Sequence, residues 1–329
     1  MSNYSATSVA CANIAFIKYW GNKDPILRIP ANGSISMTLD GLYTRTRVAF
    51  LPDLAQDELT LDGQGEKGSA LARVSHVLDR VRKLAGISLF AQVTSQNNFP
   101  IGAGLASSAS AFAALTLAAV HATELELNQQ ELSRLARTGS GSACRSIPGG
   151  FVEWLAGDSD ENSFAYSFAP ANHWDIVDCI AVVSQEQKTI SSEEGHALAE
   201  TSPLQSARVG DSHRRLEICR QAILRRDFEA FAEIIELDSN WMHAVIMTSK
   251  PPILYWLPAT ISVIQAVHQW RNEGLPVCYT IDAGPNLHVI TTSEFARQVS
   301  QQLLVLPGVE DVLTAHPGDP ARIVQDIDS

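Results

Sequence analysis

Residues 100–110, Pro-Ile-Gly-Ala-Gly-Leu-Ala-Ser-Ser-Ala-Ser, constrain the fold of this chain more than any other segment. They combine two glycines, small side chains and adjacent hydroxyls, and a run rich in Ala, Leu and Phe follows. Residues 108–122 are nearly all small or apolar, so we expect a helix buried at the centre of a domain. Amides at the start of such a helix are unpaired, and the helix dipole favours negative charge there. The segment therefore predicts a phosphate-binding loop.

Two common phosphate-binding motifs do not match this loop. It lacks the Gly-Lys-Ser/Thr ending of a P-loop, and Ser107 occupies the third glycine position of a G-x-G-x-x-G dinucleotide motif. A glycine-containing turn ahead of a core helix is the alternative interpretation.

Composition and charge exclude several classes of partner. The chain has 329 residues, 45% of them hydrophobic, which suits one large or two medium globular domains. A formal charge of −12 argues against nucleic acid or an anionic membrane as a partner. The five cysteines lack C-x-x-C spacing, which predicts reduced, mostly buried thiols and no structural zinc. Without a visible leader or membrane-length apolar run, we expect a cytoplasmic protein.

Periodicity predicts alternating strands and helices, with a polar loop at 157–175 and a polar tail from about His316. Asn128 and Glu131 form a capping-box signal at the start of one helix. Strands are expected at 10–20, 32–39, 44–51, 89–94, 151–155, 176–184, 277–281 and 287–291. Helices are expected at 69–85, 108–122, 128–138, around 216–223, at 228–237, and from Pro258 to Gly274.

Lys18 lies inside the first apolar run, and it is one of only six lysines in the chain. A buried ammonium is costly unless it meets an anion, so Lys18 indicates a polar site. The alternative is a lysine at a strand end whose ammonium reaches solvent.

Residues 139–146, Gly-Ser-Gly-Ser-Ala-Cys-Arg-Ser, form a second flexible, hydroxyl-rich segment, and it contains Arg145. Two segments suited to anions strengthen the prediction of a phosphate site, whereas Gly149 and Gly150 are best interpreted as turn residues.

Asp282 follows a predicted strand and precedes Ala-Gly-Pro-Asn. An aspartate in this position most often caps a tight turn. A functional carboxylate becomes the better interpretation if Lys18 and Arg145 reach the same cleft, because their charges would keep it ionised.

Four segments together resemble the diphosphomevalonate decarboxylases, a branch of the GHMP kinase superfamily. The glycine loop indicates only the superfamily, whereas Ile-Lys-Tyr-Trp-Gly and Ser-Gly-Ser-Ala-Cys-Arg are typical of the decarboxylases. The segments occur in the family's order and span most of the chain: 13–21, 103–109, 139–146 and 282–286.

The resemblance implies a two-lobed α+β fold, with a ribosomal protein S5 domain 2-like first lobe (1–175), a ferredoxin-like second lobe (176–329) and a cleft between them. It implies ATP and Mg²⁺ as cofactors, a phosphorylated mevalonate as substrate and commonly a homodimer. The implied reaction is the ATP-dependent decarboxylation of mevalonate 5-diphosphate to isopentenyl diphosphate, with release of CO2, ADP and phosphate.

The same resemblance assigns roles to individual residues. Asp282 would orient or deprotonate the C3 hydroxyl, Arg145 would hold the substrate carboxylate, and Lys18 would lie near Asp282 and the transferred phosphoryl group. The substrate would contact Asn13, Tyr19, Trp20, Ser140, Gly141, Ser142 and Ser202. The ATP phosphates would contact Gly102, Ala103, Gly104, Leu105, Ala106, Ser107 and Ser108, with Ser107 also near Mg²⁺.

Asn22 departs from the family pattern, in which a lysine commonly follows Tyr-Trp-Gly and belongs to the terminal-phosphate site. A neutral amide removes one positive charge from that site, although Lys23 is a neighbouring substitute. The same chemistry on mevalonate 5-phosphate, giving isopentenyl phosphate, is therefore the alternative substrate. A plain GHMP small-molecule kinase and an inactive ligand sensor are the remaining alternatives, although Lys18, Arg145 and Asp282 are all present.

Overall fold

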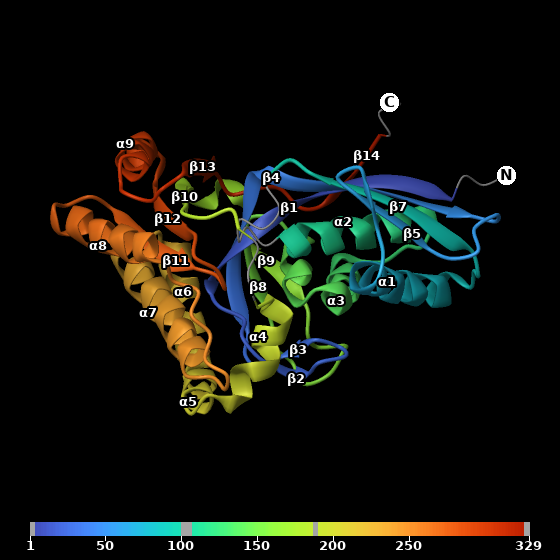
Figure 1. The fold of residues 1–329 in the computed structure, drawn as a ribbon, viewed down its shortest axis with the longest axis horizontal. Coiled ribbons are helices and arrows are strands. Elements are labelled where there is room, and N and C mark those ends of the chain that lie inside the picture. Colours follow the sequence, from blue (N-terminus) through green and yellow to red (C-terminus); the bar gives the residue numbers. More distant parts are fainter. Residues whose placement is uncertain (1–3, 100–106, 187–189, 326–329) are drawn as a thin grey trace.

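The computed structural model describes residues 4–99, 107–186 and 190–325. It shows two large β-sheets side by side, each covered by helices, and a separate two-stranded sheet (Figure 1). No helix among these residues is long and apolar enough to cross a membrane.

The larger sheet, as far as it is described, has eight strands. All of its pairings are antiparallel except that of β5 with β7. Its order is β14 (Arg322–Val324), β1 (Ser5–Ile17), β4 (Ser34–Leu51), β7 (Phe90–Asn97), β5 (Glu58–Leu61) and β6 (Gln64–Glu66), and the branch from β4 contains β8 (Phe151–Trp154) and β9 (Ala165–Ala169).

The strands predicted at 32–39 and 44–51 are one continuous strand, β4. Its register against β1 shifts between Cys11 and Asn13, opposite the polar Asp40-Gly41 pair. Gly41 has a φ of 83°, which residues with a side chain rarely adopt, so the break between the two predicted strands is a bulge within one strand.

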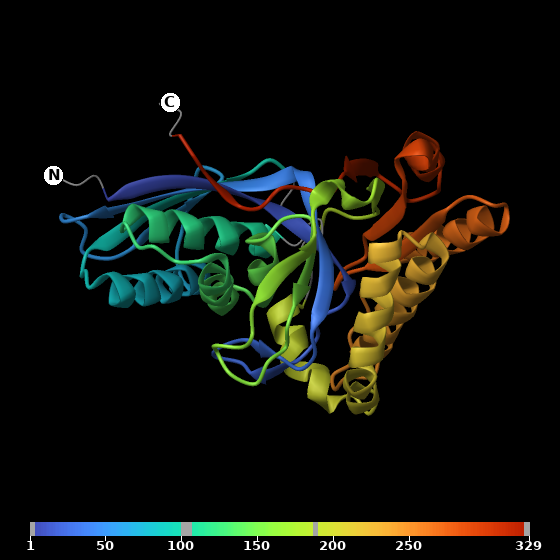
Figure 2. The same ribbon diagram turned by 180° about the vertical axis from the view of Figure 1, so that it is seen from behind.

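Three helices cover one face of this sheet: α1 (Ser69–Ala85), α2 (Ser107–Ala122) and α3 (Gln129–Gly139), as Figure 2 shows from behind. The predicted central helix is confirmed, because α2 is buried along most of its length among β1, β4, α1 and α3. Gly86 ends α1 in the left-handed conformation, and the capping box of Asn128 and Glu131 begins α3, both as predicted.

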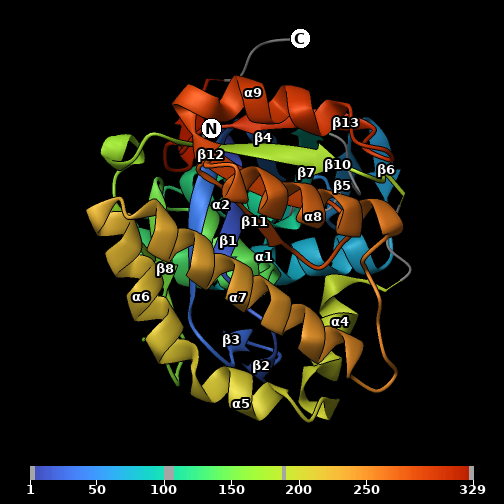
Figure 3. The ribbon, with the colours of Figure 1, turned by 90° about the vertical axis from the view of Figure 1, so that its left-hand side faces the viewer.

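The second sheet runs in the order β11 (Val277–Ile281), β12 (Leu287–Thr292), β10 (Ile176–Val182) and β13 (Asp311–Ala315). The helices α8 (Pro258–Asn272) and α9 (Ser293–Leu304) pack on one face around Val263, Val267 and Val299. The other face meets α6 (Ser212–Arg225), α7 (Phe228–Met247) and β1, and Figure 3 shows α6, α7 and α8 together.

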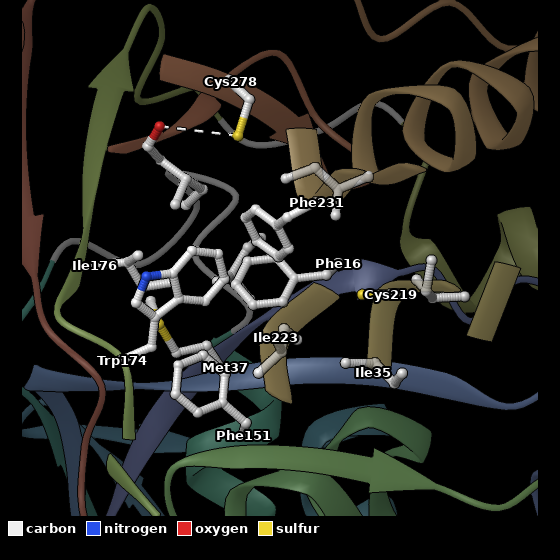
Figure 4. Packing of buried hydrophobic residues seen from close by; sticks show 14 of the residues in the cluster. Phe16, Ile35, Met37, Phe151, Trp174, Ile176, Cys219, Ile223, Phe231 and Cys278 are labelled. Carbon is white, nitrogen blue, oxygen red and sulfur yellow. Dashed lines mark hydrogen bonds between the residues drawn. The ribbon is translucent and has the colours of Figure 1, made fainter. Parts of the chain in front are cut away.

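A shared core joins the two sheets. Phe16 of β1 packs edge-on against Phe231 of α7, with ring centroids 4.8 Å apart, and Trp174 packs against the same Phe231 ring at 5.2 Å (Figure 4). Ile176 and Cys278 of the second sheet belong to this cluster, so the two lobes are joined by buried apolar contacts.

Several short elements complete the fold. They comprise β2 (Asn22–Asp24), β3 (Ile29–Pro30), α4 (Ser192–Leu198), α5 (Gln205–Gly210) and the 3-10 helices η1 (Gly141–Ser146), η2 (Ala171–His173) and η3 (Ala199–Thr201). The segment 139–146, expected to be flexible, thus includes a 3-10 helix that is largely buried.

Two expected loops contain strands. The polar stretch 157–175 contains β9, and the polar tail returns to the first sheet, where Thr7 pairs with Val324. On the way, Gly318 donates to Thr38 and its carbonyl accepts from Gly150. Backbone pairing with neighbouring strands does not depend on side-chain polarity, which is why periodicity missed both strands.

The α3 capping box gives a stability prediction. Asn128→Ala removes the acceptor 3.0 Å from the Glu131 amide, so the free energy of unfolding should fall by about 1 kcal/mol in urea denaturation. Gln130→Ala, at an exposed position in the same first turn, is the control and should change it by less than about 0.5 kcal/mol. Equal losses in the two variants would contradict the cap's contribution.

Candidate active site

The ion pair of Lys18 and Asp282 lies where the two sheets meet. Lys18 directly follows β1, Asp282 directly follows β11, and Lys18 Nζ lies 2.5 Å from Asp282 Oδ1. Only 2% of the lysine side chain is exposed, against 23% for the aspartate. The carboxylate therefore faces both a buried ammonium and solvent, and the predicted convergence of Lys18 with Asp282 is observed.

Burial and pairing oppose one another at this site. Burial disfavours ionisation of Asp282, but Lys18 outweighs it, with His288 and Arg145 contributing, so the pKa of Asp282 is lowered. Burial also lowers the pKa of Lys18, and Asp282 and Asp238 only partly offset that effect. Asp282 is thus held as a carboxylate beside an ammonium group that has lost its hydration.

A buried network fixes the backbone of Lys18. Its amide donates to Asp238 Oδ2 at 2.6 Å, and its carbonyl accepts from Arg208 Nη2 at 2.7 Å and Asn32 Nδ2 at 2.9 Å. Arg215 Nε donates to the other oxygen of Asp238 at 2.8 Å. These side chains hold the Lys18 backbone in place of a neighbouring strand, because the pairing of β1 with β4 ends at Ile17.

Sequence reasoning missed this network, although one signal for it was present. Asp238 follows Phe231, Ile234 and Ile235 at helical spacing, which places it on the buried face of α7. The sequence predicts this helix over 228–237, one residue short of Asp238. Asp238 and Ser239 instead bond to Lys18 and Ile281, so the helix continues to Met247.

Arg145 is a buried cation beside this pair. Its Nε donates to Asn13 Oδ1 at 3.1 Å and its Nη1 to Ser34 Oγ at 3.0 Å, while 4% of the residue is exposed. No carboxylate of the described residues lies within 4.0 Å of the guanidinium, so only neutral groups contact it there. Burial lowers the pKa of Arg145, and a guanidinium in such a setting favours an anionic ligand.

Asn13 connects Arg145 to η1. Its Nδ2 donates to Ser146 Oγ at 2.8 Å and to the Ser142 carbonyl at 3.3 Å. Asn13 thus orients the guanidinium and holds the hydroxyl-rich segment against β1.

Aromatic rings form the part of the site around Tyr19 and His196. The Tyr19 ring stacks on His196 at 4.1 Å and meets Trp154 at 4.7 Å, while Trp20 lies 4.5 Å from His196. A Cβ on Gly141 would lie 2.7 Å from the Tyr19 ring, so only glycine allows this close approach.

His196 is a site residue that sequence reasoning missed. Its Nδ1 accepts from the Gly21 amide at 3.0 Å. Burial, followed by the charges of Arg28 and other arginines, lowers the pKa of His196 to about 3, so the ring is neutral. An isolated histidine in a polar stretch carries no sequence signal for this role.

Asn22, which departs from the family pattern, is hydrogen-bonded to Tyr19. Its Oδ1 accepts a hydrogen bond from the Tyr19 hydroxyl. Lys23 does not take the place of the missing lysine here, because its exposed Nζ donates to the Gly157 carbonyl at 3.2 Å. Arg28 pairs with Glu193 at 2.8 Å.

Three serines join the start of α2 to η1. Ser108 Oγ at the start of α2 lies 3.2 Å from Ser140 Oγ, which lies 3.5 Å from Ser142 Oγ. The predicted phosphate-contacting residues Gly102, Ala103, Gly104, Leu105 and Ala106 lie outside the described residues.

A largely apolar cavity of about 200 Å³ opens beside Ser107 and Ser108. Leu59, Val93 and Phe112 form part of its walls, and it is bounded by α1, α2, β5 and β7. Its position next to the start of α2 is suited to a flat ring attached to a phosphate chain.

Ser202 connects to the other predicted substrate residues through Gln205, whose backbone amide donates to the Ser202 carbonyl at 3.3 Å and whose Nε2 donates to the Trp20 carbonyl at 2.9 Å. The Ser202 hydroxyl lies 2.7 Å from Thr248 Oγ1, between η3 and the end of α7. Its contact with substrate stays a prediction.

Comparisons with known proteins agree with this geometry. Residues 10–165 match the diphosphomevalonate decarboxylase-like N-terminal domain, and 179–321 match the mevalonate 5-diphosphate decarboxylase C-terminal domain. The human diphosphomevalonate decarboxylase is 39% identical, over 88% of this chain and 77% of its own.

Solved structures give the same result. The mevalonate diphosphate decarboxylase of Staphylococcus aureus has a TM-score of 0.93 and 39% identity, covering 98% of both chains. MDDEF in complex with MVAPP, AMPPCP and magnesium has a TM-score of 0.92 and 37% identity, covering 98% of this chain and 99% of its own.

The fold is therefore the two-lobed α+β fold of the GHMP kinase superfamily, as the sequence predicted. Sequence identity near 40% to diphosphomevalonate decarboxylases, across most of the chain, then identifies the branch of this superfamily. The chain belongs to the diphosphomevalonate decarboxylase family.

The Lys18–Asp282 pair predicts a pH dependence of stability. The folded-state pKa of Asp282 is lowered, so its stabilisation is present above the unfolded pKa, about 3.9, and is lost as pH falls through the folded pKa. The free energy of unfolding should therefore exceed that of Asp282→Asn at about pH 7, and the difference should shrink towards about pH 3. Urea titrations across this range measure it, and a pH-independent difference would contradict the prediction.

Proposed function

We propose that the protein catalyses the ATP-dependent decarboxylation of mevalonate 5-diphosphate to isopentenyl diphosphate, CO2, ADP and phosphate. The observation that carries the proposal is Arg145, a buried guanidinium without a carboxylate partner among the described residues, beside the Lys18–Asp282 pair. A site of this kind is suited to a substrate that has a carboxylate and a hydroxyl close together. The relatives named for this reaction support the choice of substrate.

Arg145 would bind the substrate carboxylate through its planar guanidinium. Asn13 and Ser34 hold the Nε and Nη1 atoms, which fixes the orientation of the plane before substrate binds. Fixed orientation lowers the entropic cost of placing the carboxylate opposite the leaving group at C3.

Asp282 would accept or orient the proton of the C3 hydroxyl, because its carboxylate is ionised and partly exposed. Lys18 would hold Asp282 in place and add positive charge near the transferred phosphoryl group. After the phosphate departs from C3, the Asp282 carboxylate would stabilise the positive charge that develops there, while the C–CO2 bond breaks.

ATP and Mg²⁺ fit the first lobe of this chain. The apolar walls of the cavity beside Ser107 and Ser108 suit a purine base, and the start of α2 presents unpaired amides to phosphate. When bound, ATP supplies the phosphoryl group that turns the C3 hydroxyl into a leaving group. Ser107 would contact the phosphates and their Mg²⁺; the described residues hold no cluster of three or more His, Cys, Asp or Glu side chains suited to a metal ion.

The 5-phosphoryl end of the substrate would lie near Tyr19, Ser140 and Ser142, with Gly141 leaving room for the tyrosine ring. Trp20 would form the wall behind His196, and Ser202 a more distant contact.

Turnover should depend strongly on Asp282. Asp282→Asn keeps the side-chain volume and an acceptor for Lys18 but loses the charge, so kcat should fall at least about 1000-fold, since each 1.4 kcal/mol of lost stabilisation is tenfold in rate. CO2 and ADP release are measured together, with circular dichroism as the folding control. A folded variant with near-normal turnover would remove Asp282 from the mechanism, and ADP without CO2 in the wild type would indicate a plain kinase.

Mevalonate 5-phosphate is a second candidate substrate, and a specific observation favours it. The residue after Gly21 is the neutral Asn22, bound to Tyr19, while His196 is neutral and Arg28 is paired with Glu193. The 5-phosphoryl end therefore has little free positive charge from these groups, which suits a monophosphate better than a diphosphate.

Comparing the two substrates distinguishes these candidates. Asn22→Lys adds a charge at the 5-phosphoryl end, so kcat/KM for the diphosphate relative to the monophosphate should rise about tenfold or more. Lys23→Ala, at the neighbouring exposed lysine, is the control and should leave the ratio unchanged. A strong wild-type preference for the monophosphate would change the substrate assignment but not the decarboxylation.

We propose a homodimer in the cytoplasm. The dimer is supported by large apolar side chains that are exposed near the start of α8 and the end of α9, including Leu257, Ile261, Leu304 and Val305. The cytoplasmic location is supported by the five cysteines, which are buried and free of disulfides. Light scattering should give twice the chain mass, falling to one chain mass in Val305→Glu; a wild-type monomer would contradict the dimer. We further propose that residues 1–175 and 176–329 are the two lobes, with β14 added to the first.

A further inference from the structure

A buried pair of titratable side chains lies beneath the Asp282 turn. His288 Nδ1 lies 2.6 Å from Asp178 Oδ2, and the two residues are 2% and 0% exposed. The other oxygen, Asp178 Oδ1, is buried without a hydrogen-bond partner in the part of the chain that the structure describes. The reaction described above uses neither residue, and two polar groups buried in an apolar core are costly.

Strand register places this pair on the same side of the sheet as Asp282. Thr280 pairs with His288 between β11 and β12, and Ile180 pairs with His288 between β10 and β12. Side chains opposite one another share a face, and residues two apart on one strand do so as well. Thr280, His288 and Asp178 therefore face β1, where Thr280 Oγ1 donates to the Ala15 carbonyl at 3.3 Å, three residues before Lys18.

We propose that His288, held by Asp178, is a positioning residue for Asp282 that carries a positive charge beneath the turn and keeps the carboxylate ionised. The inference rests on the proposed role of Asp282 as the group that accepts the proton of the C3 hydroxyl. It adds a second positive charge, behind the site, to the one that Lys18 supplies at its surface.

Electrostatics supports the proposal. His288 follows Lys18 among the charges that lower the pKa of Asp282 against the opposing effect of burial. Burial raises the pKa of Asp178, and His288 opposes this effect more than any other charge does. A positive charge on the His288 ring would lie 2.6 Å from Asp178 Oδ2, which is close enough for an ion pair.

A second imidazole near Asp282 provides a contrast. His243 of α7 lies 3.4 Å from the Ile281 carbonyl, and burial, then the charge of Lys18, lowers its pKa to about 3. His243 is therefore neutral, and of these two imidazoles only His288 has an ion-pair partner among the described residues. The other charged groups near the turn are Lys18, Arg145, Asp238 and Arg215.

The first test is the pH profile of kcat. In His288→Gln and Asp178→Asn we expect the pKa of Asp282 to rise, so the acid limb of the kcat profile should move up by about half to one pH unit. At alkaline pH the kcat of both variants should recover, and KM should change little. His243→Gln, which removes a neutral imidazole near the same turn, is the matched control and should leave the acid limb in place. A uniform loss of kcat at every pH, or an equal shift in the control, would overturn the proposal.

The second test needs no turnover. The Cε1–H resonance of His288, assigned among nine histidines by its absence in His288→Gln, is titrated in the wild type and in Asp282→Asn. Because the coupling is reciprocal, loss of the Asp282 charge should move the His288 titration to lower pH. A His288 that stays neutral down to about pH 5, or that ignores Asp282, contradicts the proposal. If no mevalonate phosphate releases CO2, the proposed function fails while this titration still decides the coupling.

Discussion

The contact between Lys18 and Asp282 is the interaction on which the site depends. Its partners are 264 positions apart in the chain and follow strands of different sheets. An ammonium 2% exposed requires a counter-charge, and the only one in ion-pair contact with it among the described residues comes from the other lobe. The lobes must therefore pack in one relative orientation, and the shared core around Phe16 and Phe231 fixes that orientation.

Buried charges recur around this contact, and each is held differently. Asp238 lies among Arg215, Arg208 and the Lys18 amide, so its charge is matched by rigid donors. Arg145 has neutral acceptors and no carboxylate among the described groups, so its charge is left for a ligand. This difference separates a supporting network from a binding group: a satisfied ion pair fixes geometry, whereas a desolvated cation with spare donors attracts an anion.

Much of the fold could be predicted from local signals. The apolar periodicity of α1, the capping box of α3 and the nearly all small or apolar sequence of α2 each had a local physical cause, and all three are observed. Errors occurred where contacts between distant segments override local preference. Asp40-Gly41 became a bulge because β1 pairs with both halves of β4, and the polar end of the chain became a strand because β1 offered a free edge.

The sequence by itself determined the chemical inventory of the site: a guanidinium, an ammonium, a carboxylate after a strand, and hydroxyl-rich segments beside glycine. It also left alternatives open, since Asp282 suited a turn cap and Lys18 suited a solvent-reaching lysine. Only the tertiary structure decided between them, because Coulomb and hydrogen-bond energies depend on separations of a few ångströms that are set by packing between the sheets. The roles of Asn13, Asp238 and His196 depend on that packing too, since nothing local to their positions specifies their partners.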